Sequence, residues 1–308
     1  MTLQQMEYIV AVYRLRHFAK AAEHCKVTQP TLSSMIQKLE DELGIRIFDR
    51  STQPVTPTPA GRLVVEQAWK VITRANKIKD IVAEEKNSLK GTFRIGILPT
   101  IAPYLLPRFF PQLTDSHPET DLRIAEMKTD EIKKALIRGD IDAGILVSLD
   151  GMEQFEQTPL FYEQFLAYVS RGDALFSKSS IRAADLDNEF LWLLDEGHCF
   201  RDQLVRFCGL KSAQASKSVY SLGSIETFMR MVESGKGVTF IPELALPQLS
   251  GSQRELVRPF AIPIPTRQTV LVTTRSFVRH GLRDLLTGTI RASVPASMLE
   301  LNNTEQRV

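Results

Sequence analysis

Two of the chain's three cysteines, Cys199 and Cys208, lie nine positions apart among residues that favour thiol chemistry. His198 precedes Cys199 and Arg201 follows it by two positions. An imidazole and a guanidinium both stabilise a thiolate. If the residues between the cysteines form a helix, a rise of about 1.5 Å and a turn of about 100° per residue place the sulfurs ~13 Å apart on opposite sides. A disulfide needs Cα atoms within about 7 Å, so a bond would require a different backbone and the pair could act as a conformational switch.

Two other interpretations of these cysteines stay open. Cysteine is among the most often buried residue types, so both thiols could belong to the core without a redox role. A metal site made from His198, Cys199 and Cys208 would lack a fourth ligand at suitable spacing, and we predict no metal. The third cysteine, Cys25, lies on the apolar side of an N-terminal helix and is interpreted as a core residue.

Length and composition suit a protein of two domains, because 308 residues with 43% hydrophobic and 24% charged side chains can form two cores. The N-terminus lacks the basic-then-apolar layout of a secretory signal, and no apolar run approaches the roughly 20 residues of a membrane span. We therefore expect a cytoplasmic protein with no membrane contact. In that compartment a disulfide between the two cysteines would be transient rather than a structural staple.

The N-terminal region has the pattern of a helix-turn-helix. Apolar residues at helical spacing predict helices that begin near Leu3 and Phe18, and a third begins at Thr28 and ends at Gly44. The third helix is apolar inside and carries small polar groups outside, which can approach base edges and phosphates. A short strand and a wing follow. The residues predicted to contact double-stranded DNA are Thr28, Gln29, Pro30, Thr31, Ser33, Ser34, Lys38 and Arg50.

The charge balance agrees with this interpretation without deciding it. The first 90 residues carry 14 Lys and Arg against 10 Asp and Glu, a modest basic surplus. A three-helix packing domain with a polar surface therefore stays the alternative.

A long helix follows, with a cap at Thr58 and Pro59. Its apolar positions from Val64 to Val82 are separated by four and three residues in alternation, a 3.5-residue repeat typical of a two-stranded coiled coil. We therefore predict a homodimer formed through this helix, which would present two reading helices to a palindromic site. The alternative is a single amphipathic helix that lies on its own domain.

From Gly91 onward, strands alternate with helices, which predicts an α/β domain with a largely parallel sheet. Only the segment from Asn302 has the composition of a disordered tail. We expect helices over residues 101–113, 130–138, 201–207, 224–233 and 277–291. We expect strands over residues 93–98, 121–127, 142–147, 165–170, 190–194, 218–222, 238–241 and 268–274.

Five short segments together resemble the LysR-type transcriptional regulators, over the chain from Met1 to about Arg291. They are FAKAA at 18–22, VTQPTLS at 27–33, LEDELG at 39–44, FDR at 48–50 and TPTPAG at 56–61. The resemblance implies a winged helix-turn-helix over residues 1–57, a linker and dimerisation helix over 58–90, and a regulatory domain over 91–308. That domain would contain two subdomains like those of periplasmic binding proteins, residues 91–162 with 267–300, and residues 163–266. It also implies tetramers that bind promoter DNA and act with RNA polymerase.

Within that family, the residues from Gly197 to Cys208 resemble the members that sense hydrogen peroxide. The resemblance implies that Cys199 is the peroxidatic thiol, that Cys208 is the resolving thiol, and that a reductant of the glutaredoxin or thioredoxin type restores them. Peroxide would be the signal, and no cofactor is expected. The chain departs from the family pattern at residues 209–217. The pocket and the support of the thiolate would involve Thr100, Thr129, His198, Arg201 and Asp202.

Helix capping is an alternative role for Thr100 and Thr129, because each precedes a predicted helix. The leading hypothesis is a regulator of antioxidant genes that responds to peroxide through a reversible Cys199–Cys208 disulfide. The first alternative is a regulator whose effector is a small metabolite bound between the subdomains. A thiol peroxidase is the second, and it is disfavoured because it would need neither the reading helix nor the coiled coil. We therefore predict a protein that is not an enzyme.

Overall fold

The computed structural model describes residues 1–86, 89–187, 189–195, 198–209 and 224–308. The chain forms two compact units, Met1–Lys86 and Asn87–Val308. Each unit has its own cluster of buried apolar side chains.

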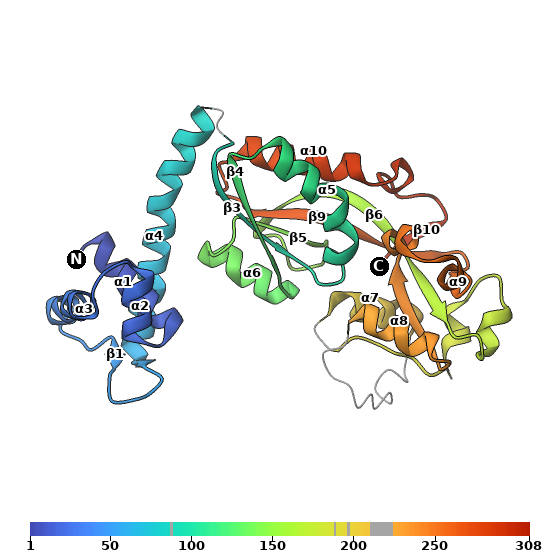
Figure 1. The fold of residues 1–308 in the computed structure, drawn as a ribbon, viewed down its shortest axis with the longest axis horizontal. Coiled ribbons are helices and arrows are strands. Elements are labelled where there is room, and N and C mark those ends of the chain that lie inside the picture. The colour runs from blue at the N-terminus through green and yellow to red at the C-terminus, as the bar shows by residue number, and fades with distance from the viewer. Residues whose placement is uncertain (87–88, 188, 196–197, 210–223) are drawn as a thin grey trace. The chain divides into compact units, whose positions relative to one another are not determined.

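The first unit is a bundle of short helices with a two-stranded ribbon and one long helix (Figure 1). Threonine hydroxyls cap three of its helices: Thr2, Thr28 and Thr58 accept hydrogen bonds from main-chain N–H groups at 3.2, 3.4 and 2.9 Å. Gly44 ends the third helix with a φ of 68°. The elements are α1 (Leu3–Leu15), α2 (Phe18–His24), α3 (Gln29–Leu43), β1 (Phe48–Asp49), β2 (Thr56–Pro57) and α4 (Pro59–Glu85). The predicted helix-turn-helix and the caps at Thr28 and Thr58 are confirmed.

Helix α4 is buried only near its beginning. Gly61, Val65 and Ala68 are buried in the first unit. Gly61 allows this close approach, because a Cβ there would lie 1.9 Å from the carbonyl oxygen of Ile47. Farther along, α4 exposes large apolar side chains at Val71, Ile78, Ile81 and Val82. The helix therefore lies on its own domain at one end and leaves an apolar stripe at the other.

The second unit is built on a mixed β-sheet, whose strands run in the order β4-β3-β5-β9-β6-β7. Strand β10 pairs with β9, and β8 pairs with β6. The strands are β3 (Gly91–Ile97), β4 (Thr120–Glu126), β5 (Ala143–Val147), β6 (Phe155–Val169), β7 (Val238–Pro242), β8 (Val257–Pro259), β9 (Ile264–Thr274) and β10 (Glu305–Arg307).

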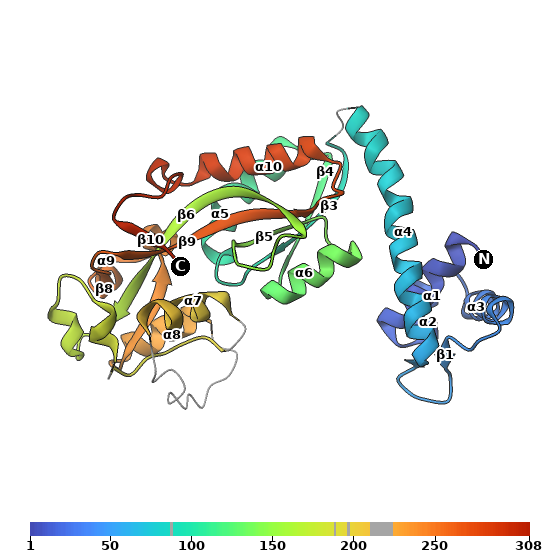
Figure 2. The same cartoon turned by 180° about the vertical axis from the view of Figure 1, so that it is seen from behind.

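Strand β6 extends from one part of the second unit into the other, and β9 lies along its first part (Figures 1 and 2). The first part of β6 pairs antiparallel with β9, from Phe155 opposite Thr274 to Gln164 opposite Thr266. The last part of β6 pairs instead with β7 and β8. Strand β6 therefore belongs to both parts of the second unit. The first layer also contains β3, β4, β5, β9 and β10, and the second layer also contains β7 and β8. Residues near Gln164 lie where one layer passes into the other.

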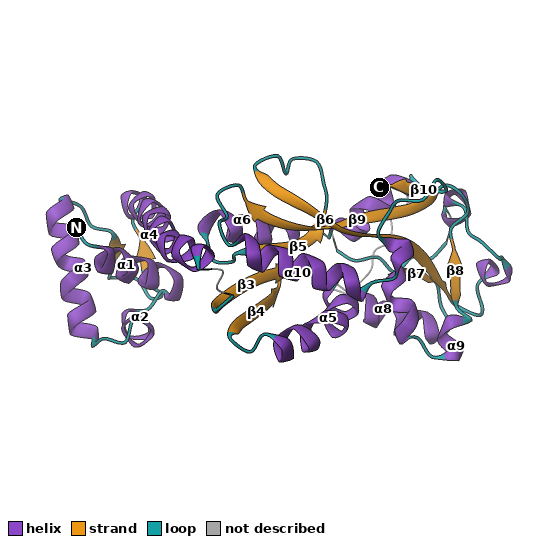
Figure 3. Ribbon diagram, turned by 90° about the horizontal axis from the view of Figure 1, so that it is seen from above, coloured by secondary structure: helices purple, strands orange, loops and turns teal. Residues whose placement is uncertain are grey.

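Helices flank both layers, and Figure 3 shows how they alternate with the strands. Helix α10 lies on one side of the first layer and α6 on the opposite side (Figure 1). Helices α7 and α8 both lie in the second layer (Figures 1 and 2). The helices are α5 (Ala102–Ser116), α6 (Thr129–Arg138), α7 (Cys199–Cys208), α8 (Ile225–Glu233), α9 (Gly251–Arg254) and α10 (His280–Ser293), with short 3₁₀ turns at Ala174–Ser177, Ala183–Leu186, Glu243–Gln248 and Ala296–Met298.

The predicted largely parallel sheet is wrong. Pairs β3–β4, β3–β5 and β9–β10 are parallel, whereas β5–β9, β6–β9, β6–β7 and β6–β8 are antiparallel. The alternation of strands and helices does not reveal that β9 returns from the end of the chain to the middle of the sheet. That return inserts an antiparallel strand among parallel ones.

Two other predicted segments differ from the structure. Residues 190–194 form no regular strand, because their one ladder contact is a bridge from Leu191 to Val238. The segment from Asn302 is ordered rather than disordered, since Glu305–Arg307 pairs with β9. Polar composition hid this strand, because an edge strand is stabilised by main-chain hydrogen bonds that composition does not show. The predicted strand over 218–222 lies outside the described residues.

Candidate functional site

The two cysteines of the proposed switch lie at the first and last positions of helix α7, Cys199–Cys208. Both are buried free thiols. A helical rise of about 1.5 Å over nine residues separates them by ~13 Å along the axis. Gly209 ends the helix with a φ of 63°. The predicted helical barrier between the thiols is therefore confirmed, and the helix is longer than predicted at both ends.

The Cys199 thiol is 8% exposed, and its surroundings act on it in opposite directions. Burial raises the pKa of Cys199, and this is the largest effect. The positive charge of Arg267, the hydroxyl of Thr129 and the N–H of Phe200 oppose it, in that order, and Asp202 adds to the increase. The expectation that the basic neighbours lower this pKa is therefore wrong for the reduced form. At this depth, the free-energy cost of removing a thiolate from water is larger than the stabilisation that the nearby donors supply.

The charge that faces Cys199 comes from Arg267 on β9, not from Arg201. Arg201 instead lies 3.5 Å from the carboxylate of Asp202, the next residue on α7. Asp202 thus pairs with a guanidinium on its own helix. The sequence had suggested Arg201 because it lies two positions after Cys199, whereas Arg267 on β9 is far from Cys199 in the sequence.

Arg267 is the centre of a buried polar network. Its Nε donates to Oε2 of Glu163 at 2.8 Å, and both side chains are 1% exposed. Its Nη1 donates to Oγ1 of Thr100 at 3.2 Å, and its Nη2 donates to the Thr100 carbonyl oxygen at 3.0 Å. The guanidinium also lies 5.0 Å from the centre of the Phe200 ring. Sequence analysis missed Arg267 and Glu163, although a charged residue inside each of two apolar strands was a signal.

The predicted pocket threonines both lie close to this network. Thr100 is 4% exposed and accepts from Arg267. Thr129, the first residue of α6, is 7% exposed, and its hydroxyl lies near Cys199 but forms no hydrogen bond of normal geometry in the described part of the chain. Neither hydroxyl caps a helix, so the capping alternative is wrong. Thr129 thus lies beside the thiol, and Thr100 is connected to it through Arg267.

The remaining titratable groups are at the two ends of α7. His198 is the N-terminal cap residue, and burial, followed by the charge of Lys128, lowers its pKa below the usual value. Its imidazole is therefore neutral near pH 7. At the other end, burial, with a smaller effect of Asp187, raises the pKa of Cys208 to about 12. Both thiols thus favour the protonated form while α7 is intact.

The predicted DNA-reading residues form one exposed surface on α3 and the wing. Seven of the eight are exposed, and Ser33 is half-buried. Arg50 ties the wing to α3, because it donates to Ser33 Oγ at 3.0 Å and to Glu40 Oε2 at 3.1 Å. Glu40 is 2% exposed and also accepts from the main-chain N–H groups of Ile47 and Phe48. The apolar face of α3 is buried at Leu32, Ile36 and Leu39.

The described residues show neither a metal-binding cluster nor a membrane span. They contain no group of three or more His, Cys, Asp and Glu side chains that could hold a metal ion. None of the helices that the structure describes has both the length and the apolar composition of a membrane span.

Comparison with known proteins agrees with this architecture. The family model for the LysR substrate binding domain matches residues 86–288, and the model for bacterial regulatory helix-turn-helix proteins of the lysR family matches residues 3–62. A hydrogen peroxide-inducible genes activator from Dickeya chrysanthemi is 33% identical, and the match covers 98% of this chain and 99% of that protein.

Two solved structures are also similar. A full-length OxyR variant from Pseudomonas aeruginosa is 36% identical with a TM-score of 0.77, over 94% of this chain and 98% of that one. An OxyR mutant from Porphyromonas gingivalis is 46% identical with a TM-score of 0.67, over 71% of this chain and 100% of that one.

A helix-turn-helix joined to an α/β regulatory unit defines a bacterial transcription regulator rather than an enzyme. The chain belongs to the LysR family of these regulators. Within the family it is closely related to the OxyR activators. The predicted family and fold class are therefore confirmed.

Proposed function

We propose that this protein is a DNA-binding regulator that senses hydrogen peroxide at Cys199 and records the signal as a Cys199–Cys208 disulfide. One observation carries the proposal: Cys199 is buried beside the charge of Arg267 and the hydroxyl of Thr129, at the start of a helix that ends at Cys208. These two cysteines match the redox pair of the OxyR relatives. Control of antioxidant genes is part of the same proposal, which is supported by relatives named as activators of hydrogen peroxide-inducible genes.

The chemistry begins with attack of the Cys199 thiolate on one oxygen of the peroxide. The O–O bond breaks, a sulfenic acid forms on Cys199, and the leaving hydroxide takes up a proton to become water. The hydroxyls of Thr100 and Thr129 and the guanidinium of Arg267 are the donors available to the oxygen that gains charge. His198, which is neutral, can accept the thiol proton.

The second step joins the two sulfurs. The Cys208 thiol gives up its proton, its sulfur attacks the Cys199 sulfur, and the sulfenic oxygen leaves as a second water. Because α7 holds the thiols ~13 Å apart, this step requires the helix to unwind. The loss of α7 and its packing then changes the conformation of the regulatory unit. A dithiol reductant of the glutaredoxin or thioredoxin type would return both thiols.

The DNA-binding part of the proposal rests on α3 and α4. The exposed polar face of α3, with Arg50 on the wing, is suited to the major groove and adjacent phosphates. The apolar stripe on α4 suits pairing with a second copy, and the family resemblance adds a tetramer and a contact with RNA polymerase. A cytoplasmic location belongs to the same proposal, because promoter DNA and thiol reductants are found there.

Intact-protein mass spectrometry after addition of one equivalent of peroxide tests the switch. Wild type should lose two hydrogens, and peptide mapping should place the bond between Cys199 and Cys208. Cys208→Ser should instead gain one oxygen on Cys199. Cys25→Ser is the matched control and should behave as wild type. Unlinked cysteines together with unchanged DNA footprints would reject the proposal, and a response to a small metabolite instead would favour the first alternative.

A further inference from the structure

The last strand of the chain is fixed beside the switch helix. Strand β10 pairs parallel with the beginning of β9, from Glu305 opposite Ile264 to Arg307 opposite Thr266. The main-chain N–H of Val308 donates to the Thr266 carbonyl oxygen at 3.1 Å and extends the ladder by one bond.

Side chains fix β10 to two other parts of the second unit. Arg307 Nη2 donates to Ser148 Oγ at 2.7 Å, and Gln164 Nε2 donates to Glu305 Oε1 at 2.7 Å. Ser148 directly follows β5, and Gln164 lies on β6. The strand is thus held by three neighbouring elements and can serve as a rigid support.

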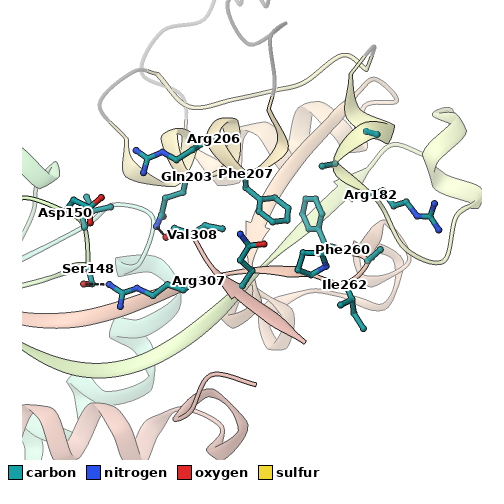
Figure 4. Close-up of a pocket in the computed structure, with 16 residues that line it drawn as sticks. Ser148, Asp150, Arg182, Gln203, Arg206, Phe207, Phe260, Ile262, Arg307 and Val308 are labelled. Carbon is teal, nitrogen blue, oxygen red and sulfur yellow. Dashed lines mark hydrogen bonds between the residues drawn. The ribbon is translucent and has the colours of Figure 1, made fainter. Parts of the chain in front are cut away.

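Helix α7 contacts this support through its central glutamine. Gln203 Nε2 donates to the main-chain oxygen of Val308 at 2.6 Å (Figure 4). Gln203 is 3% exposed, and its Oε1 is buried with no hydrogen-bond partner among the residues that the structure describes. A buried amide with one bond made and one missing depends strongly on the bond that it has.

Part of the same face of α7 borders a cavity. A cavity of about 940 Å³ lies between α7, which contributes Gln203, Arg206 and Phe207, and β10, which contributes Arg307 and Val308 (Figure 4). Phe207 contacts Phe260, with ring centres 6.1 Å apart, and the Gln203 bond links α7 directly to the end of the chain. Phe200 lies one turn before Gln203 on the same side of α7, and its ring centre is 4.7 Å from that of Phe165.

We propose that Gln203 is a positioning residue, which acts through Val308 and β10 to keep α7 helical and so sets the rate of the resolving step. The proposal rests on the proposed function, because it assigns a part to the conversion of sulfenic acid into disulfide. Unwinding α7 must break the Gln203 bond before Cys208 can approach Cys199. Removing the bond in advance removes part of that barrier.

Gln203→Leu tests the proposal, because leucine keeps most of the side-chain volume and cannot donate. Peroxide attack on Cys199 is measured in a Cys208→Ser background, and disulfide formation is measured by acid quench and mass spectrometry with both cysteines present. We expect the attack rate to change less than about twofold and disulfide formation to become about fivefold faster, the effect of one net hydrogen bond.

A variant without residues 305–308 should show the same acceleration, and adding Gln203→Leu to it should accelerate the step no further, since both changes remove one interaction. Arg206→Ala is the matched control, because Arg206 lies on the same helix beside the same cavity but makes no bond to β10. Its disulfide formation should match wild type. An unchanged resolving rate in Gln203→Leu would overturn the proposal.

Hydrogen exchange in the reduced protein provides a readout that needs no peroxide. Amides of α7 should exchange about fivefold faster in Gln203→Leu than in wild type, whereas those of α8 should not change. If wild type formed no disulfide, the proposed function would fail. The exchange result would still test whether the bond from Gln203 to Val308 stabilises α7. Equal exchange of the α7 amides in both proteins would show that the bond from Gln203 to Val308 does not stabilise α7.

Discussion

At Cys199, burial and local charge act on one thiol in opposite directions. The side chain is 8% exposed, and desolvation raises its pKa despite the nearby guanidinium of Arg267. A raised thiol pKa means that the thiolate, the form that attacks peroxide, is scarce near pH 7. The pH therefore directly controls how much of Cys199 is thiolate.

The rate of sulfenic acid formation should therefore rise with pH. Between about pH 6 and about pH 8, both below the raised pKa, each unit should increase the thiolate fraction and the rate about tenfold. Stopped-flow measurement of Cys208→Ser with excess peroxide gives this rate alone. A rate that is already constant near pH 7 would show that Cys199 is ionised and that the site lowers its pKa.

Removing the charge of Arg267 should affect both stability and reactivity. Arg267→Met leaves Glu163 buried without its partner, which costs about 3–5 kcal/mol in the free energy of unfolding. Urea denaturation measures this loss, and the double variant with Glu163→Gln should recover much of it. Peroxide attack should stay slow in both variants, because neither supplies the positive charge. Recovered reactivity in the double variant would contradict the role of Arg267 beside the thiolate.

At the scale of single elements, α3 separates binding from folding by its two faces. Gln29 is exposed at the start of the helix, whereas Leu32 is fully buried in the first unit. The buried face holds the helix in the unit, and the exposed face is available to bases. A substitution on the exposed face should therefore weaken DNA binding with little change in stability, whereas one on the buried face should lower stability.

Gln29→Ala should weaken binding to promoter DNA about tenfold with little change in stability, since one good base contact contributes about 1–3 kcal/mol. Leu32→Ala should lower the free energy of unfolding by about 2–5 kcal/mol, because it leaves a cavity. Fluorescence anisotropy and urea denaturation measure the two quantities. If Gln29→Ala bound like wild type at several salt concentrations, α3 would not be the reading helix.

For the whole molecule, we predict that assembly depends on the far half of α4. Val71, Ile78 and Val82 expose large apolar side chains at helical spacing, and Ile78 is 65% exposed. Burial of such a stripe against a second copy would remove apolar surface from water, which is the main favourable contribution to coiled-coil pairing.

Ile78→Asp should therefore give a smaller species by sedimentation at concentrations where wild type is oligomeric. Its folded units should keep their thermal stability, because the side chain contributes little to the core. Asn76→Asp is the matched control, since it introduces the same charge at an exposed position of the same helix. Equal sedimentation of wild type and Ile78→Asp would exclude α4 as the dimer contact.

The helices were predictable because their determinants are local. A threonine at position 28 or 58 caps the helix that follows it, Gly44 and Gly209 end helices, and a segment of helical pattern separates Cys199 from Cys208. Each of these follows from hydrogen bonds within a few residues. The reading helix, the long helix and the barrier between the thiols were therefore determined by the sequence itself.

Tertiary structure alone decided what surrounds the thiol and what supports the switch helix. Arg267 and Glu163 are 104 positions apart in sequence and 2.8 Å apart in space, because two strands bring them together. Gln203 meets Val308 in the same way across 105 positions. Strand partners, buried ion pairs and the direction of a thiol pKa all depend on contacts between distant segments. A periodic pattern in one segment does not show which distant segment will contact it.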